Sequence, residues 1–259
     1  MIRAAVVAAA MSLLVNPLAA ATADPLNSGN WDWVRGFLFE DAETVFDERV
    51  VVKAPKFAED NMNVPFVVDA RGLDDVQKIV VFADSNPILR VLSMEPVKAE
   101  PFIAASLKMQ QGGPVRAAAL TPDGVWHVGG VFVDAAGGGC TEPASVHAQD
   151  DWMDHLGEMH AKTWLQDDGS QRATIRAYHP MDTGLADGIP AFFIERLDIK
   201  DADGEVLAHI EPAEPVAQHP SMTVLVRPEE GSAHLTIDGR DTEANLLQGQ
   251  TPLDWDLAS

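Results

Sequence analysis

The sequence contains one cysteine, Cys140, among its 259 residues. A lone cysteine cannot form a disulfide within its own chain, so it is either an intermolecular partner or a reactive thiol. Basic residues are also scarce, because 18 Lys and Arg stand against 40 Asp and Glu, for a formal net charge of −22. A chain this acidic repels phosphate backbones and anionic lipid, which excludes nucleic acid as a partner.

Long apolar runs and common catalytic motifs are missing from most of the chain. Residues 1–23 combine Arg3, a short apolar run and the small-residue ending Ala21-Thr22-Ala23, which is typical of a secretory signal peptide. No later run is long enough to serve as a membrane anchor. The sequence has no phosphate loop, dinucleotide fingerprint, zinc-protease motif or Ser-His-Asp order. We therefore expect an exported protein that is not an enzyme.

Short apolar runs separated by Asn, Asp, Gly and Pro turns occupy the remainder, and this spacing predicts antiparallel β-sandwiches. A short helix is expected first, over residues 31–41, from its apolar residues at helical spacing. Strands are predicted at residues 50–52, 64–68, 79–82, 88–92, 103–107, 115–120, 126–133, 173–178, 191–199, 205–210, 222–226 and 233–237. Residues 150–165 have acids at the start and apolar residues at helical spacing, and they predict a connector helix.

Cys140 directly follows Gly137, Gly138 and Gly139 at the end of the first group of strands. Consecutive glycines are retained where the backbone must swing or pass through a tight space. Seven extended residues, from Asp134 to Cys140, would reach roughly 23 Å. The residues alone leave two interpretations open: a thiol on a mobile tether, or an ordinary interdomain linker with an incidental cysteine.

Two sets of motifs stand out along the chain. The first half contains VVVKAP at 50–55, VPFVV at 64–68, Asn86-Pro87, Leu107-Lys108-Met109 and the Gly-Gly-Cys arm, and the second half contains HPMDTG at 179–184. Through the first set the chain resembles the sulfur-carrier subunit of the periplasmic thiosulfate-oxidising system, the SoxY family. Through HPMDTG it resembles the partner subunit, the SoxZ family. The expected organisation is a signal peptide (1–23), a SoxY-like domain (24–140), a linker with a helix (141–168) and a SoxZ-like domain (169–259).

The resemblance implies an all-β protein with two immunoglobulin-like sandwiches, joined by the Gly-rich loop and the connector helix. It implies that Cys140 holds a sulfur intermediate as a covalent adduct, without any other cofactor, and presents it to periplasmic redox enzymes or sulfur-oxidising proteins. Fused proteins of this kind are similar to those named for association with a quinoprotein dehydrogenase. In the carrier family the arm ends the chain, whereas here Thr141 and a second domain follow Cys140. An arm held at both ends has a shorter reach.

Two alternatives to a carrier remain. A thiolate with His and Met is a set of ligands that suits copper, and the candidates near Cys140 are His147, Met153, His155, Met159 and His160. The five-residue spacing of His155 and His160 does not place them well on one helical face. The other alternative is a non-covalent structural adaptor, for which Cys140 would be dispensable.

Overall fold

The computed structural model describes residues 23–253 and 255, so nearly all of the predicted signal peptide lies outside the described residues. The described chain has one α-helix, α1 (Trp31–Phe39), and two short 3-10 helices, η1 (Ser145–Ala148) and η2 (Trp152–His155). Its strands are β1 (Thr44–Phe46), β2 (Val51–Lys53), β3 (Val64–Asp69), β4 (Lys78–Ala83), β5 (Arg90–Glu95), β6 (Ala99–Leu107), β7 (Gly113–Leu120), β8 (Trp126–Val133), β9 (Met159–Leu165), β10 (Gln171–Ala177), β11 (Asp182–Thr183), β12 (Ala191–Phe192), β13 (Ile194–Lys200), β14 (Val206–Pro212), β15 (Ser221–Val226), β16 (His234–Asp241) and β17 (Leu246–Pro252).

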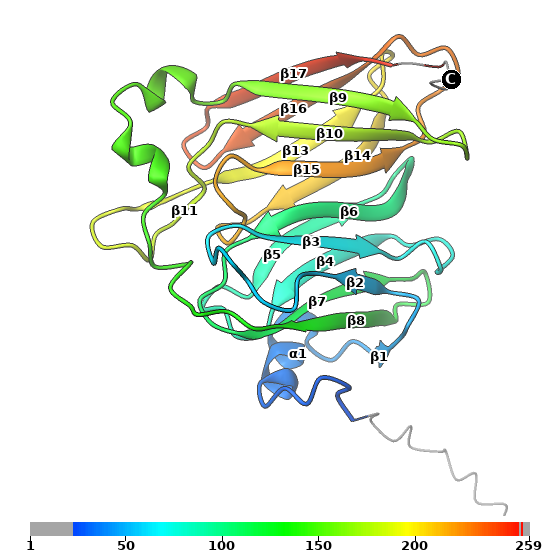
Figure 1. The fold of residues 1–259 in the computed structure, drawn as a ribbon. Coiled ribbons are helices and arrows are strands. Elements are labelled where there is room, and N and C mark those ends of the chain that lie inside the picture. The colour runs from blue at the N-terminus through cyan, green and yellow to red at the C-terminus, as the bar shows by residue number, and fades with distance from the viewer. Residues whose placement is uncertain (1–22, 254, 256–259) are drawn as a thin grey trace, which may run out of the picture.

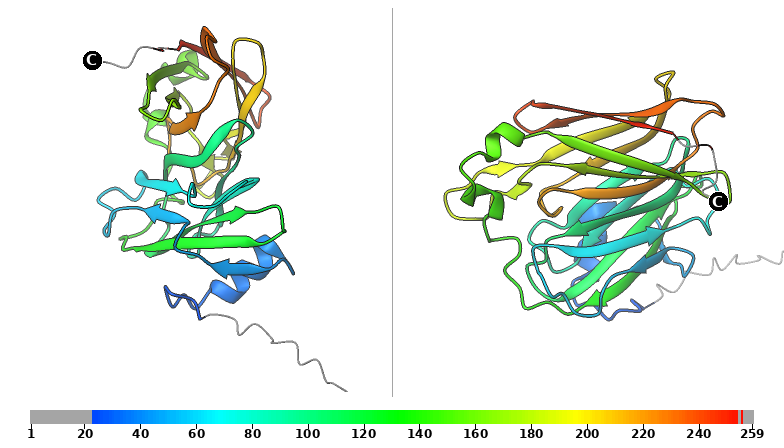
Figure 2. Two further views of the ribbon diagram at one scale, coloured as in Figure 1. Left: turned by 90° about the vertical axis from the view of Figure 1, so that its right-hand side faces the viewer. Right: turned by 45° about the horizontal axis from the view of Figure 1, so that its top comes forward.

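Two sheets form the body of the protein, as Figures 1 and 2 show. The larger sheet has nine strands in the order β1-β8-β7-β4-β5-β14-β13-β16-β17, and the smaller has six in the order β2-β3-β6-β15-β10-β9. A buried hydrophobic cluster contains residues from both sheets. The prediction of an all-β sandwich is therefore confirmed, while the immunoglobulin-like topology stays a prediction.

Both sheets run without a break from the first half of the chain into the second. In the larger sheet β5 pairs with β14, where Met94 lies opposite Ile210, and in the smaller sheet β6 pairs with β15, where Ile103 lies opposite Val224. We call these two pairings the seam. Since all four of these residues are buried in one cluster, the halves share a core as well as their backbone hydrogen bonds.

Burial along the strands follows from what covers each face. The strand β3 alternates between buried and more exposed positions, as expected when one face meets the core. By contrast, β4 is buried at nearly every position. The reason is the predicted N-terminal helix, confirmed here as α1, which covers the outer face and packs Trp31, Val34 and Phe39 against Val80 and Phe82.

A buried ion cluster fixes the N-terminal segment to this helix-covered face. Arg116 is 1% exposed, and its guanidinium pairs with Asp84 at 3.0 Å and with Asp24 at 2.7 Å. The same guanidinium lies 4.8 Å from the centre of the Trp31 ring. Two carboxylates and an aromatic face thus compensate the buried charge of Arg116.

The predicted connector helix over residues 150–165 is wrong. The structure has only the four-residue η2 there, followed by the strand β9, whose side chains alternate between more and less exposed positions. Gly157 separates the two with a φ of +81°, a conformation that favours glycine. The strand β9 pairs along its length with β10, so hydrogen bonding to a neighbour outweighs the local helical spacing. None of the helices in the described residues has the length and apolar character to cross a membrane.

Candidate functional site

Cys140 lies where the two halves of the chain meet, and it is fully buried, at 0% exposure. The chain reaches it from the end of β8, after Asp134 forms an isolated parallel bridge with Phe57. A thiol at the end of a mobile tether would be exposed to solvent, whereas this structure encloses the Cys140 side chain. The cause is tertiary: residues from both halves close over the turn that carries Cys140.

The three glycines before Cys140 pass through a tight space in this structure. The Gly138 and Gly139 amides donate to the carbonyl oxygens of Gln110 and Met109, each at 3.0 Å. A Cβ atom on Gly139 would come within 2.8 Å of the Met109 oxygen and closer still to that of Asn61. Gly137 and Gly138 have φ values of +104° and +92°, which favour glycine. The glycines therefore permit close packing here, whatever mobility they allow in another state.

Groups from the first half surround the sulfur and the amide of Cys140. The Cys140 Sγ lies 3.7 Å from the carbonyl oxygen of Lys108, and the Cys140 amide donates to the Gln110 side chain at 3.2 Å. The side chain of Asn86, in the turn between β4 and β5, donates to the same Lys108 carbonyl at 2.8 Å. The predicted turn thus also positions the backbone beside the thiol.

The second half contacts Cys140 and Lys108 through residues 179–184, which we call the cap turn. Its Thr183 hydroxyl donates to the Cys140 carbonyl oxygen at 2.6 Å. From the other side, the Lys108 ammonium donates to the carbonyl oxygen of Met181. Gly184 has a φ of +76°, and a Cβ there would meet Ala191 at 2.9 Å, so the turn is tightly packed. The HPMDTG motif is therefore brought directly onto the candidate cysteine.

Burial dominates the electrostatics of this site. It raises the pKa of Cys140 to about 11, and the positive charge of Lys108 offsets part of the rise. Burial lowers the pKa of Lys108 to about 8, and the charges of Asp182 and Cys140 oppose that change. In the enclosed state the thiol is thus protonated and unreactive at neutral pH, beside a cation.

Two histidines border the cap turn in different environments. His147, on η1 and 26% exposed, meets the Asp182 carboxylate at 2.8 Å. His179 is fully buried, its Nδ1 accepts the Met181 amide at 3.1 Å, and its Nε2 lies 3.4 Å from the Asp241 carboxylate. Burial lowers the pKa of His179, which stays neutral near pH 7. Both ring nitrogens of His179 thus lie close to groups of the protein itself, at Met181 and Asp241.

The copper candidates do not gather around the thiol. His155 bonds Glu158 at 2.9 Å and packs its ring against Tyr178, while His147 is turned to Asp182. Among the described residues no group of three or more His, Cys, Asp or Glu side chains could hold a metal ion.

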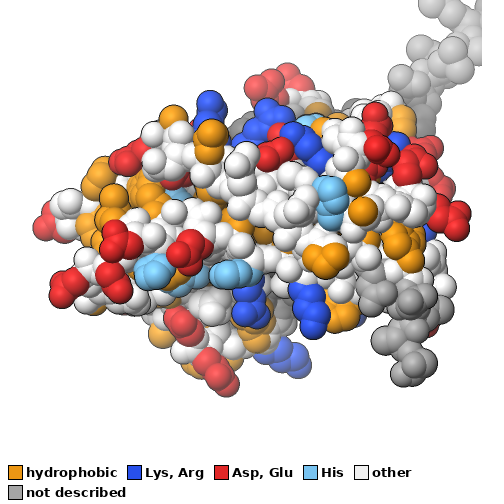
Figure 3. Space-filling model, turned by 90° about the horizontal axis from the view of Figure 1, so that it is seen from above, with side chains coloured by type: hydrophobic (Ala, Val, Ile, Leu, Met, Phe, Trp, Pro, Cys, Tyr) orange, Lys and Arg blue, Asp and Glu red, His pale blue; other side chains and the backbone are white. Residues whose placement is uncertain are grey.

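Figure 3 shows histidines on the surface seen from above, beside Lys and Arg side chains. A hollow of about 310 Å³ is lined by His160, His219 and Tyr178, the residue that precedes the cap turn, among others.

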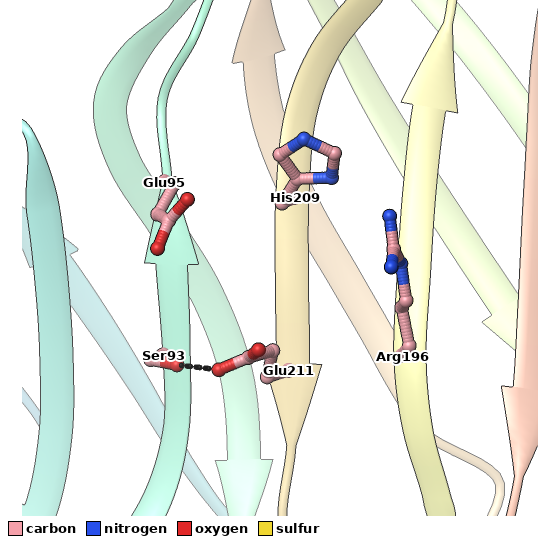
Figure 4. Close-up of a pocket in the computed structure, with 5 residues that line it drawn as sticks. All are labelled: Ser93, Glu95, Arg196, His209 and Glu211. Atoms are coloured by element: carbon pink, nitrogen blue, oxygen red, sulfur yellow. Dashed lines mark hydrogen bonds between the residues drawn. The ribbon is translucent and has the colours of Figure 1, made fainter.

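A second hollow, of about 240 Å³, opens on the outer face of the nine-stranded sheet at the seam (Figure 4). It is lined from β5, β14 and β13 by Ser93, Glu95, Arg196, His209 and Glu211. Its polar groups have partners: the Ser93 hydroxyl donates to Glu211 at 2.8 Å, and His209 meets Asp198 at 2.6 Å. These contacts cross the seam or lie beside it, and they indicate a stabilising role rather than a binding site.

The sequence identified Cys140 and its glycines but missed what encloses them. Lys108, Asp182 and Thr183 belong to the family-like motifs, which alone do not indicate a role for them at the thiol. A lysine between two apolar residues at the end of a predicted strand was the available signal, since a buried lysine needs a partner. That the partner is the HPMDTG motif depends on the pairing of β6 with β15, which local sequence does not show.

The comparisons with known proteins agree with this location. Residues 35–140 match the family model described as sulfur oxidation protein SoxY, and the match ends on Cys140. This part, which is less than half of the chain, is therefore a SoxY-family domain. No curated protein matches the chain.

Several solved structures are similar to the chain at low sequence identity. The sulfur carrier protein SoxY from Chlorobium limicola f thiosulfatophilum is 18% identical, with a TM-score of 0.37, over 41% of this chain and 96% of that one. A beta-glycosidase from Bacteroides vulgatus is 12% identical, with a TM-score of 0.24, over 82% of this chain and 25% of that one. A family 2 glycosyl hydrolase from Bacteroides cellulosilyticus is 11% identical, with a TM-score of 0.20, over 73% and 24% of the two chains.

Proposed function

We propose that the protein is a non-enzymatic sulfur carrier, in which Cys140 holds a sulfur-containing intermediate covalently and presents it to partner enzymes. The observation that supports this most is the coincidence of the SoxY family match with the only cysteine of the chain. The second half, which resembles SoxZ through its HPMDTG motif, contacts the backbone of Cys140 through Thr183 of that motif. On this proposal the second half serves as a built-in partner subunit.

The chemistry of loading defines what the partners must supply. When the Cys140 thiol and a sulfur anion form an S–S bond, the two reactants lose one proton and two electrons. The electrons need an acceptor, so the loading partner is a redox protein that accepts two electrons. We propose periplasmic redox enzymes for this role, with a quinoprotein dehydrogenase or a sulfur-oxidising protein as the candidates. A periplasmic location follows if residues 1–23 act as the signal peptide.

Loading also requires a change in the enclosure. A thiol with 0% exposure cannot be attacked by a partner enzyme, and its raised pKa keeps it protonated. We therefore propose that the structure represents the protected form. A partner would gain access by displacing the cap turn, because the paired strands of the seam hold the two halves together.

Intact mass spectrometry of protein purified from its native source tests the proposal. We expect a fraction of the molecules to carry a sulfur, sulfite or thiosulfate adduct that is removed by reductant and is absent from Cys140→Ala. A thiol that is bare under all growth conditions, together with unchanged physiology of the Cys140→Ala strain, would contradict the carrier role. In that case co-purification of the same partners with Cys140→Ser would instead support a structural adaptor.

A further inference from the structure

Lys108 is a buried cation of the first half whose ammonium and amide both donate hydrogen bonds to the second half. Its side chain is 1% exposed, and its backbone is held by a hydrogen bond from its amide to the Pro215 carbonyl at 2.6 Å. Its carbonyl oxygen faces the Cys140 sulfur, and its ammonium crosses to the cap turn. Burying an ammonium is costly unless the charge is used or compensated.

The hydrogen bonds of the ammonium leave part of its capacity unused. A lysine ammonium has three N–H donors, and among the described residues only the Met181 carbonyl oxygen accepts one of them. The compensating charge is Asp182, whose carboxylate also meets His147. The site thus holds one cation and one nearby carboxylate, beside a thiol that is uncharged.

We propose that Lys108 selects the charge of the cargo: its ammonium holds the negative end of the group carried on Cys140, so that anionic adducts are retained in preference to neutral ones. This inference rests on the proposed carrier function. It adds to that function the residue that recognises the cargo and the chemical class of the cargo. The ligand class is a short adduct that ends in an oxyanion, such as a sulfonate.

The balance of charges in the enclosure supports this assignment. An anionic adduct adds a negative charge to a low-dielectric space that already contains Asp182, and without Lys108 that space would have two like charges and no cation. The other titratable groups facing Lys108 are Cys140 itself, which loses its proton on loading, and His179, which burial keeps neutral. A neutral adduct would gain nothing from the ammonium.

Alkylation with a matched pair of reagents tests the charge preference. The Cys140 thiolate attacks the methylene carbon of iodoacetate or iodoacetamide, and iodide leaves; the two products differ mainly in one negative charge. The measured quantity is the ratio of the two second-order rate constants, because the thiolate fraction and the opening of the cap turn cancel in it. We expect this ratio to be higher in the native protein than in the protein unfolded in urea.

Replacing the lysine should reverse that preference. In Lys108→Met we expect the ratio to fall by about tenfold, since an opposite charge within a few ångströms typically shifts an ionic equilibrium by one unit or more. The double variant Lys108→Met with Asp182→Asn should return the ratio to the urea value. Lys98→Met, which removes an exposed lysine that pairs with Glu229, should leave it unchanged.

A measurement on the unaltered protein provides a second test that does not depend on folding of the variants. As pH rises through the pKa of Lys108, about 8, the ammonium loses its charge and the native ratio should fall, in the same direction as in Lys108→Met. A ratio that is independent of pH between 7 and 9.5 in the native protein, or unchanged in a folded Lys108→Met, would overturn the proposal. Adducts found on Cys140 in native protein would still support the carrier role in that event, so the two failures are distinguishable.

Discussion

The hydroxyl of Thr183 offers a direct way to loosen the enclosure of Cys140. Thr183→Val keeps the shape of the side chain but removes its hydrogen bond to the Cys140 carbonyl oxygen, which is 2.6 Å long. Leaving a buried carbonyl unsatisfied costs about 1–3 kcal/mol. If the closed state of the variant bears that cost and the open state does not, the ratio of open to closed molecules rises about tenfold for every 1.4 kcal/mol.

The assay is the rate of iodoacetamide labelling of Cys140 under native conditions, followed by intact mass. With a pKa of about 11 instead of the ordinary 9.0, the enclosed thiol has a thiolate fraction about a hundredfold lower at neutral pH, so the wild-type rate should be far below that in urea. Thr183→Val should label about thirtyfold faster than wild type, as a cost of about 2 kcal/mol, in the middle of the stated range, implies.

Thr163 provides the matched control. Its hydroxyl donates to the Pro252 carbonyl oxygen at 2.8 Å, and the two threonines are 7% and 6% exposed, but Thr163 lies on β9 away from the cap turn. Thr163→Val should therefore lose stability without faster labelling. Equal labelling rates in Thr183→Val and wild type, or an equal acceleration in Thr163→Val, would refute the reasoning that this hydrogen bond holds the enclosure shut.

Three further predictions concern stability, measured by urea unfolding. Because burial lowers the pKa of His179, the unfolded chain takes up its proton first, so stability should fall as pH drops below about 6.5, and His179→Gln should flatten that slope. Gly139→Ala should destabilise by about 1–3 kcal/mol through overpacking, whereas Gly36→Ala, with open space around it, should not destabilise the protein. Arg116→Met should cost about 3–5 kcal/mol, since it leaves two carboxylates in a buried cluster; an effect under 1 kcal/mol would contradict the ion-pair description.

Most strands could be predicted because the signals that define them are local. The turn at Asp201 is an example: Gly204 takes a φ of +84°, and the Asp201 amide donates to the Glu205 carbonyl at 3.0 Å, as the residue types indicate. The strand β9 could not be predicted in the same way. Its residues continue an apolar spacing that fits a helix, and only the partner strand β10 determines its conformation.

The site was predictable only in part, for a similar reason. A single cysteine after three glycines is visible in composition, and Cys140 is where the family match ends. Its burial depends on contacts between residues far apart in sequence, such as the hydrogen bond from Thr183 to Cys140 across 43 positions. Charge and spacing along one segment contain no information about which distant turn will cover it.

The seam makes protection of the thiol independent of protein concentration. If the two halves were separate chains, dilution would dissociate them and expose Cys140, because association is governed by mass action. In one chain, with β5 paired to β14 and β6 paired to β15, the cap turn is always present at the high effective concentration of an intramolecular contact. A low concentration of the protein therefore does not expose the cysteine. Access to Cys140 depends on local motion or on a partner.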